Sequence, residues 1–108
     1  MSMIQAFYRG LTKLHPVALG EFDCVASAWD NGGNGVDVSA YDLILVSCQE
    51  DVHVAADSSA DQYSGTTPAF LPAGSNWFYR GNHTHLHFKN VSEDSNVFLT
   101  GFVLAGQE

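Results

Sequence analysis

The sequence has few charged residues, and very few of them are basic. Asp, Glu, Lys and Arg make up 15% of its 108 residues, with twelve acidic side chains against four basic ones. The basic residues, which form no cluster, are Arg9, Lys13, Arg80 and Lys89. Nucleic acids and anionic membrane surfaces are bound by clustered Lys and Arg, so we predict neither as a partner. A small domain with so little charge commonly covers part of its surface in an oligomer or a larger assembly.

Long hydrophobic runs are also absent. No stretch approaches the roughly 20 apolar residues that span a bilayer, and the first residues contain no secretory h-region. We therefore expect synthesis in the cytoplasm without export. Only two cysteines occur, Cys24 and Cys48, and they form no Cys-X-X-Cys motif. Two buried free thiols are the simpler interpretation, but a disulfide stays open because the sequence does not fix their Cα separation.

No segment has the 3.6-residue apolar period over helical length, and strand signals dominate instead. Short apolar or alternating runs, separated by turns rich in Gly, Pro, Asn and Ser, predict seven to eight antiparallel strands. The clearest runs are Phe22–Trp29, Leu43–Cys48, Val52–Ala56, Trp77–Tyr79 and Val97–Leu104. The pattern predicts one all-β domain over residues 1–108, a β-sandwich or jelly roll. For residues 1–16 the alternatives are a first strand and an extended N-terminal arm.

Two segments are predicted to be loops. Asp30–Gly35 is the stronger signal, because Gly and Asn adopt positive φ angles at low cost. Asp57–Pro68 is rich in Ser, Thr, Asp and Gly, which indicates an exposed loop. A single helical turn is expected near Thr12–His15 or Val38–Tyr41.

The most informative motif is a row of three alternating histidines, His83, His85 and His87. Alternate side chains of a β-strand share one face, so the three would lie together on one side of a strand. One interpretation is a polar outer face that meets water or a partner chain and changes charge near neutral pH. The other is a metal site, because imidazole binds Zn, Fe and Ni.

The metal interpretation has two versions. In the first, the chain is a small cupin-like β-barrel, but no glutamate follows the His-X-His pair at the spacing of the first cupin motif. The second cupin motif also departs from the pattern, because Pro72-Ala73-Gly74 precedes the histidines instead of following them. In the second version, His-X-His strands of three chains meet on a threefold axis around one ion.

Catalytic motifs are missing from the sequence. It contains no Gly-X-Ser-X-Gly nucleophile elbow and no phosphate-binding loop. The adjacent acids Glu50 and Asp51 would lie on opposite faces of a strand, which does not favour paired-carboxylate catalysis. The aromatic run Trp77–Tyr79 favours core or interface packing over a sugar-binding platform, with a glycan-binding module kept as a third hypothesis. We therefore expect a protein that is not an enzyme.

The order of features in residues 43–104 resembles a known class of protein. An apolar strand, Ile44–Cys48, leads to Glu50, Asp51 and His53. Next comes a loop rich in Ser and Thr, and after it the segment Phe70–Gly74. The order ends with an aromatic strand and an apolar closing strand. This order is similar to small β-sandwich virion proteins of tailed bacteriophages, the capsid cement or decoration proteins and related minor structural proteins. The family has no shared functional-residue motif to transfer, and the histidine row is not one of its features.

The resemblance implies a non-enzymatic homo-oligomer located in the virion and made in the host cytoplasm. Its partners would be a capsid or tail structural protein and further copies of itself, with no cofactor. The residues that we predict to make contacts are Phe7, Tyr8, Trp77, Tyr79, His83, His85 and His87. The alternative function is a small metal-binding, cupin-like protein that binds Zn, Fe or Ni through the histidine row.

Overall fold

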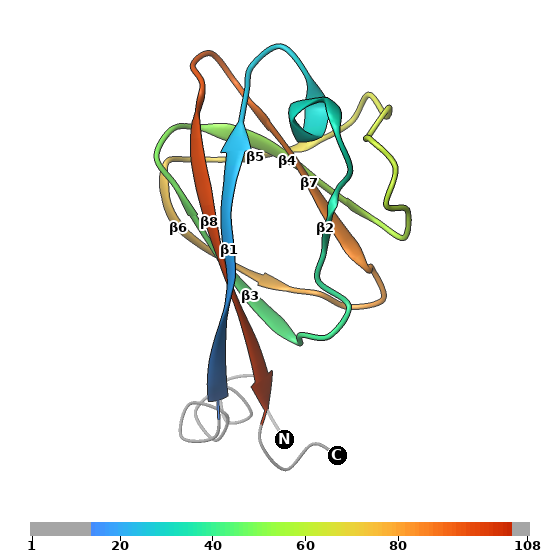
Figure 1. Ribbon diagram of the computed structural model, residues 1–108, viewed down its shortest axis with the longest axis vertical. Helices are drawn as coiled ribbons and strands as arrows, with labels where there is room; N and C mark the ends of the chain where they lie inside the picture. The colour runs from blue at the N-terminus through green and yellow to red at the C-terminus, as the bar shows by residue number, and fades with distance from the viewer. Residues whose placement is uncertain (1–13, 105–108) are drawn as a thin grey trace.

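Two antiparallel β-sheets face each other in the computed structural model, which describes residues 14–104 (Figure 1). The elements in chain order are β1 (Leu14–Cys24), the 3-10 helix η1 (Trp29–Gly32), β2 (Val36–Asp37), β3 (Leu43–Cys48), β4 (Val52–Asp57), β5 (Ala69–Leu71), β6 (Gly74–Tyr79), β7 (His85–Asn90) and β8 (Ser95–Leu104). The first sheet has the order β1-β8-β3-β6 and the second the order β2-β7-β4-β5. The predicted all-β class and β-sandwich are confirmed. Within these residues, no helix has the length and apolar character needed to cross a membrane.

The core lies between the two sheets and follows from the alternation of side chains along each strand. In β3, Ile44, Val46 and Cys48 are buried, whereas the residues between them are only half-buried. Strands β4, β7 and β8 contribute alternate residues in the same way. The buried apolar residues are Cys24, Val38, Ile44, Val46, Cys48, Val52, Val54, Leu71, Leu86, Phe88, Val97 and Leu99.

The strand that contains Phe22 ends earlier than the sequence suggested, and it also begins earlier, at Leu14. The alternation of Phe22–Trp29 predicted a strand up to Trp29, but β1 ends at Cys24 and Trp29 begins η1. The reason lies downstream, because Asp30 and Asn31 have φ angles of 55° and 52°, in the left-handed region where a strand cannot continue. The single helical turn therefore lies at Trp29–Gly32. Of the two places where the sequence suggested such a turn, residues 14–15 belong to β1, and Val38–Tyr41 forms one hydrogen-bonded turn, with the Tyr41 N–H donating to the Val38 carbonyl oxygen at 3.1 Å, but no helix.

The prediction of a strand or an extended arm at residues 1–16 can be compared with the structure only for residues 14–16. Residues 1–13, with Phe7 and Tyr8, lie outside the described residues. Residues 14–16 belong to β1, where they pair with residues 102–104 of β8.

Two loops lie against the outer side of the second sheet, as Figure 1 shows near β7. The first contains η1 and runs to Gly35, and the second connects β4 to β5, as the composition of Asp57–Pro68 predicted. The loops bind each other. The Gly35 N–H donates to the carbonyl oxygen of Ala60 at 2.9 Å, and Gln62 Nε2 donates to the carbonyl oxygen of Trp29 at 2.9 Å. This contact between the loops positions the buried polar group described below.

The two cysteines are free and buried. Strands β1 and β3 lie on opposite sides of β8, so Cys24 and Cys48 are separated by two strand spacings, about 9–10 Å. That distance exceeds the Cα separation that a disulfide spans. Burial, together with the nearby Cys48 and Asp30, raises the pKa of Cys24 to about 12. The disulfide that the sequence left open is therefore not formed.

The centre of the core can be tested at Ile44, whose side chain is fully buried. Ile44→Ala should lower the free energy of unfolding by about 2–5 kcal/mol, and Ile44→Val by about 0.5–1.5 kcal/mol, because the larger truncation leaves the larger cavity. Urea denaturation followed by fluorescence measures both values. Equal, small effects of the two substitutions would contradict a close-packed core at this position.

Candidate functional site

His87 lies at the centre of the most constrained polar site in the described residues. Its neighbours Leu86 and Phe88 point into the core, so His87 points to the outer side of β7. Its exposed fraction is nevertheless 0%, because the two loops cover it. The sequence predicted that this histidine would lie on a polar face open to water or a partner. In the structure, His87 is instead buried beneath the loops.

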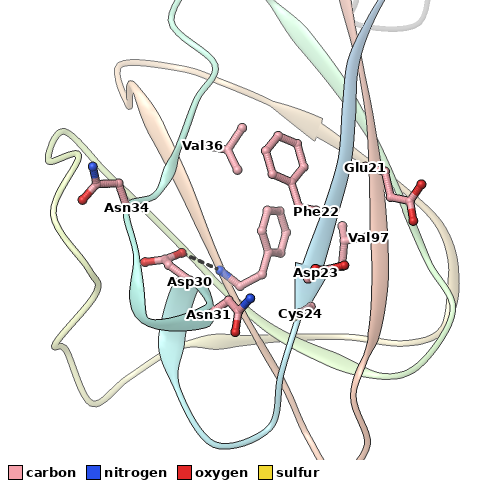
Figure 2. Close-up of a pocket in the computed structure, with 10 residues that line it drawn as sticks. Glu21, Phe22, Asp23, Cys24, Asp30, Asn31, Asn34, Val36 and Val97 are labelled. Carbon is pink, nitrogen blue, oxygen red and sulfur yellow. Dashed lines mark hydrogen bonds between the residues drawn. The ribbon is translucent and has the colours of Figure 1, made fainter.

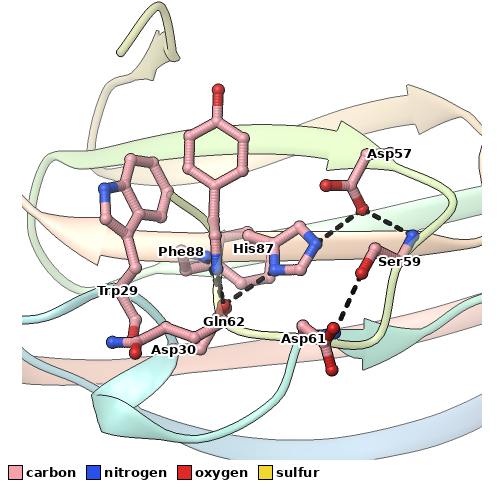
Figure 3. Close-up of polar contacts among 9 residues, drawn as sticks. Trp29, Asp30, Asp57, Ser59, Asp61, Gln62, His87 and Phe88 are labelled. Carbon is pink, nitrogen blue, oxygen red and sulfur yellow. Dashed lines mark hydrogen bonds and ion pairs between the residues drawn. The ribbon is translucent and has the colours of Figure 1, made fainter. Parts of the chain in front are cut away.

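Both ring nitrogens of His87 face carboxylates (Figure 3). Nδ1 lies 2.7 Å from Asp30 Oδ2, and Nε2 lies 2.8 Å from Asp57 Oδ1. A neutral imidazole has one N–H donor, whereas the protonated ring has two. Two ionised carboxylates at these distances therefore fit the imidazolium form, in which each nitrogen donates one charge-assisted hydrogen bond.

Each carboxylate is fixed by its own loop. The Asp30 side chain is only 2% exposed, and it accepts hydrogen bonds from the backbone N–H groups of Tyr63 at 3.1 Å and Phe88 at 3.3 Å. Asp57 is 37% exposed and accepts a hydrogen bond from the Ser59 N–H at 3.0 Å, which closes the start of the β4–β5 loop. The imidazole therefore connects β7 to both loops at once.

The environment raises the pKa of His87 and lowers the pKa of Asp57. Burial by itself lowers the pKa of His87, but the hydrogen bonds and charges of Asp30 and Asp57 outweigh it, and the pKa is raised above 6.5. For Asp57, burial raises the pKa, but the Ser59 and His87 hydrogen bonds outweigh this effect and lower it below 3.8. The charged forms of both groups are therefore favoured by folding.

Aromatic rings and one glycine close the site. The Tyr63 ring lies 5.6 Å from the His87 ring, centroid to centroid, and Trp29 contacts Tyr63 edge-on at 4.6 Å. On Gly35 a Cβ atom would overlap the His87 ring, so only glycine allows this close approach of the backbone. With both nitrogens bonded and the ring covered, the geometry allows His87 to hold the loops on the sheet and leaves it no free nitrogen for another ligand.

The structure does not bring the histidine row together. His83 precedes β7, is exposed, and bonds through its backbone to Arg80. His85 is half-buried, and its Nδ1 lies 2.7 Å from Thr84 Oγ1. Within residues 14–104, no group of three or more His, Cys, Asp or Glu side chains is arranged to hold a metal ion. Metal binding by the row, including its threefold version, stays a prediction.

A pocket of about 260 Å³ lies beside Asp30, between β1 and the segment of η1 and β2 (Figure 2). Its walls are largely apolar and include Phe22, Val36 and Phe88. The carboxylate at its inner end is that of Asp30, which is already bonded to His87, Tyr63 and Phe88. Glu21, also at the pocket, points away from Phe22 and Val36 in Figure 2. Asp23, Asn31 and Asn34 also line the pocket, beside its apolar residues.

The outer side of the first sheet carries three exposed aromatic side chains, whereas β5 of the second sheet carries one, Phe70. Trp77, Tyr79 and Phe98 are 51%, 78% and 39% exposed, and the Trp77 ring lies 5.2 Å from that of Phe102. Cross-strand rows place these rings beside half-buried leucines of β3. We call this surface the outer aromatic face. Its residues are Leu43, Leu45, Ser47, Ser75, Trp77, Tyr79, Phe98, Thr100 and Phe102, and none of them is charged.

The predicted contact residues fall on different surfaces. Trp77 and Tyr79 lie on the outer aromatic face of the first sheet, whereas His85 and His87 belong to the second sheet. The sequence analysis missed Asp30 and Asp57 as partners of His87, because each was interpreted as a loop residue. They lie 57 and 30 residues from His87, and no local motif in the sequence connects them.

Comparisons with models of protein families, with curated proteins and with solved structures give no match. The function is therefore inferred from two features of the molecule. One is the site around His87, which holds the loops in place, and the other is the uncovered aromatic face.

The His87 site predicts a specific pH dependence of stability. A histidine whose pKa is raised by folding stabilises fully below its unfolded pKa, about 6.5, and this stabilisation is lost as the pH rises through the folded pKa. At the acid end, the contribution of Asp57 is present above its unfolded pKa, about 3.8, and is lost as the pH falls through its lower folded value. Urea denaturation from about pH 5 to pH 9 measures the alkaline decline.

A matched pair of variants tests whether His87 causes the loss of stability at alkaline pH. His87→Gln should remove it, whereas His85→Gln, at a residue with no carboxylate hydrogen bond, should keep the wild-type slope. If His87→Gln does not fold, titration of the wild-type His87 ring by NMR gives the same test. A normal or lowered pKa of this ring would contradict the assignment.

Gly35 tests the packing of the first loop. Gly35→Ala should lower the free energy of unfolding by about 1–3 kcal/mol, because its Cβ displaces the imidazole or lifts the loop. Gly33→Ala is the control in the same loop, where a Cβ meets only the Asp30 carbonyl oxygen at 3.4 Å. It should change stability by no more than about 0.5 kcal/mol. Equal effects in urea denaturation would argue against close contact at Gly35.

Proposed function

We propose that this protein is a non-catalytic structural subunit of a phage virion, of the decoration or cement type, which binds coat protein and its own copies. The observation that carries this proposal is the outer aromatic face of the sheet β1-β8-β3-β6. The resemblance of residues 43–104 to small β-sandwich virion proteins supports the choice of the virion.

The composition of the outer aromatic face matches that of an interface core. Such cores are depleted of charge and enriched in Trp, Tyr and Phe, which supply most of the binding energy. Complete burial of one large apolar side chain contributes roughly 1.5–3 kcal/mol, and three exposed aromatic residues lie on this face. The chain has a net charge of −8, and the part of this face formed by β3, β6 and β8 carries no charged side chain. Acidic side chains border it only on β1, where Glu21 lies opposite Phe98, so copies of the chain repel one another least towards the β6 end of the face.

The other sheet supports the same conclusion by contrast. Its outer side is covered by the two loops, where Trp29 and Tyr63 pack over His87. Among the described residues, no corresponding loop covers Trp77 or Tyr79. The loops therefore cover the β7 part of the second sheet, although Phe70 of β5 stays 56% exposed on the same side, whereas the aromatic side chains of β6 have no such cover.

Association through the outer aromatic face is tested by light scattering after size-exclusion chromatography. The wild-type protein should form oligomers, and Phe98→Asp should weaken association at least about tenfold, because it places a charge on the face. Val91→Asp is the matched control, since Val91 is 44% exposed but lies in the turn after β7. A wild-type monomer at all concentrations, or equal effects of the two variants, would refute association through this face.

The virion assignment has its own test. Mass spectrometry of particles purified from the phage or prophage that encodes the chain should detect it in stoichiometric amount with the coat protein. Its absence from such particles would leave an assembling β-sandwich with another role, so the two parts of the proposal fail separately.

A further inference from the structure

The two sheets have four edge strands, and the chain protects three of them. Edge strands expose unpaired N–H and C=O groups, so proteins shorten them or interrupt them with Pro, charges or bulges. Strand β2 has only two residues, and β5 has three and lies between Pro68 and Pro72. Strand β1 has an irregular register between Ala18 and Gly20, followed by the exposed Glu21.

Strand β6 has none of these protections. It has six residues, no proline and no charge, and it pairs with β3 in a continuous register. Within residues 14–104, no strand pairs with its other side, which forms the left edge of the sandwich in Figure 1. Its residues Trp77 and Tyr79 are the most suited to cross-strand contacts, because aromatic pairs stabilise neighbouring strands.

We propose that two copies of the chain pair through β6, antiparallel, about a twofold axis at Trp77, and so form one continuous eight-stranded sheet. This inference rests on the proposed function and names one interface of the assembly. It concerns the edge of the first sheet, whereas the proposal above concerns the face as a whole.

Symmetry restricts the register of this pairing. A twofold axis perpendicular to the sheet keeps both outer aromatic faces on the same side, and paired residues must share a face. The residue at the axis therefore lies opposite the same residue of the other copy. The two residues at the centre of β6, and thus the two choices for the axis, are Asn76 and Trp77. With Trp77 at the axis, the two tryptophans pair, and the large Tyr79 lies opposite Ser75 of the partner subunit.

Charge at the two ends of β6 favours an antiparallel partner. Arg80 follows the strand, and the Asp51 carboxylate accepts a hydrogen bond from the Ala73 N–H at 2.8 Å, just before the strand begins. Antiparallel pairing brings the Arg80 end of one strand towards Asp51 of the partner subunit, although the Arg80 guanidinium also donates hydrogen bonds to the carbonyl oxygens of Tyr41 and His83 in its own chain. The strand between these ends is uncharged, so the net charge of −8 on each copy adds no like-charge contact along β6.

A charge-swap experiment tests whether the twofold axis passes through Trp77. Trp77→Lys and Trp77→Glu should each weaken self-association by about tenfold or more, because like charges then lie opposite each other. An equimolar mixture of the two variants should restore a dimer, since opposite charges now meet at the axis. Sedimentation velocity measures the mass, and far-UV circular dichroism checks that each variant is folded.

Thr100 provides the matched control, because it lies in the same cross-strand row as Trp77 but two strands in from the edge. Because Thr100 belongs to the outer aromatic face but not to the edge, Thr100→Lys and Thr100→Glu should remove contacts between faces and still leave a dimer paired through β6. A second readout avoids charge altogether: Trp77→Cys should form an interchain disulfide on mild oxidation, and Thr100→Cys should not.

The outcomes separate this inference from the proposed function. If the Thr100 variants dissociate the protein as the Trp77 variants do, or if folded Trp77→Lys and Trp77→Glu do not recombine, then pairing through β6 is refuted while assembly through the face stands. If the wild-type protein is a monomer and the Trp77→Cys variant forms no interchain disulfide, self-association is refuted both through the face and through β6. Binding to coat protein is then decided by the analysis of purified particles alone.

Discussion

The bond of His87 to two carboxylates is the interaction on which the arrangement of this molecule depends. Asp30 and Asp57 sit on separate loops, and a single buried ring holds both loops against β7. A buried charge is tolerated only when it is paired and hydrogen-bonded, and here each partner also has backbone donors. Loss of the ring would leave the buried Asp30 carboxylate without its charge partner, which is the costly way to disturb such a site.

This interaction gives the two sides of the sandwich different characters. Around His87, the outer side of the second sheet is covered by loops, aromatic rings and the Gly35 backbone. The outer side of the first sheet keeps Trp77, Tyr79 and Phe98 exposed. A small domain has limited apolar surface to divide between its own core and its partners. In this chain the outer aromatic face and the β6 edge are adjacent, so the proposed sheet extension and the proposed face contact are compatible with each other.

Much of the fold could be predicted from local patterns. The runs Leu43–Cys48 and Val52–Ala56 are strands β3 and β4 almost to the residue, because alternation and β-branched composition act within one segment. The end of β1 could not be predicted in this way, since Ala26 and Ala28 continue the alternation while the φ angles of Asp30 and Asn31 turn the chain. Trp77 and Tyr79 lie in the aromatic strand that the sequence predicted, and the structure places them on its exposed side.

The sequence by itself determined the class of fold, the turn-rich segments and the shortage of charge that suggests covered surface. It also identified the histidines as unusual residues. Only the tertiary structure decided which histidine is buried, which carboxylates bind it, and which sheet edge is left unprotected. The physical reason is that alternation and turn preference are properties of neighbouring residues. Hydrogen bonds across 30 and 57 residues, by contrast, depend on how loops and sheets are placed together in space.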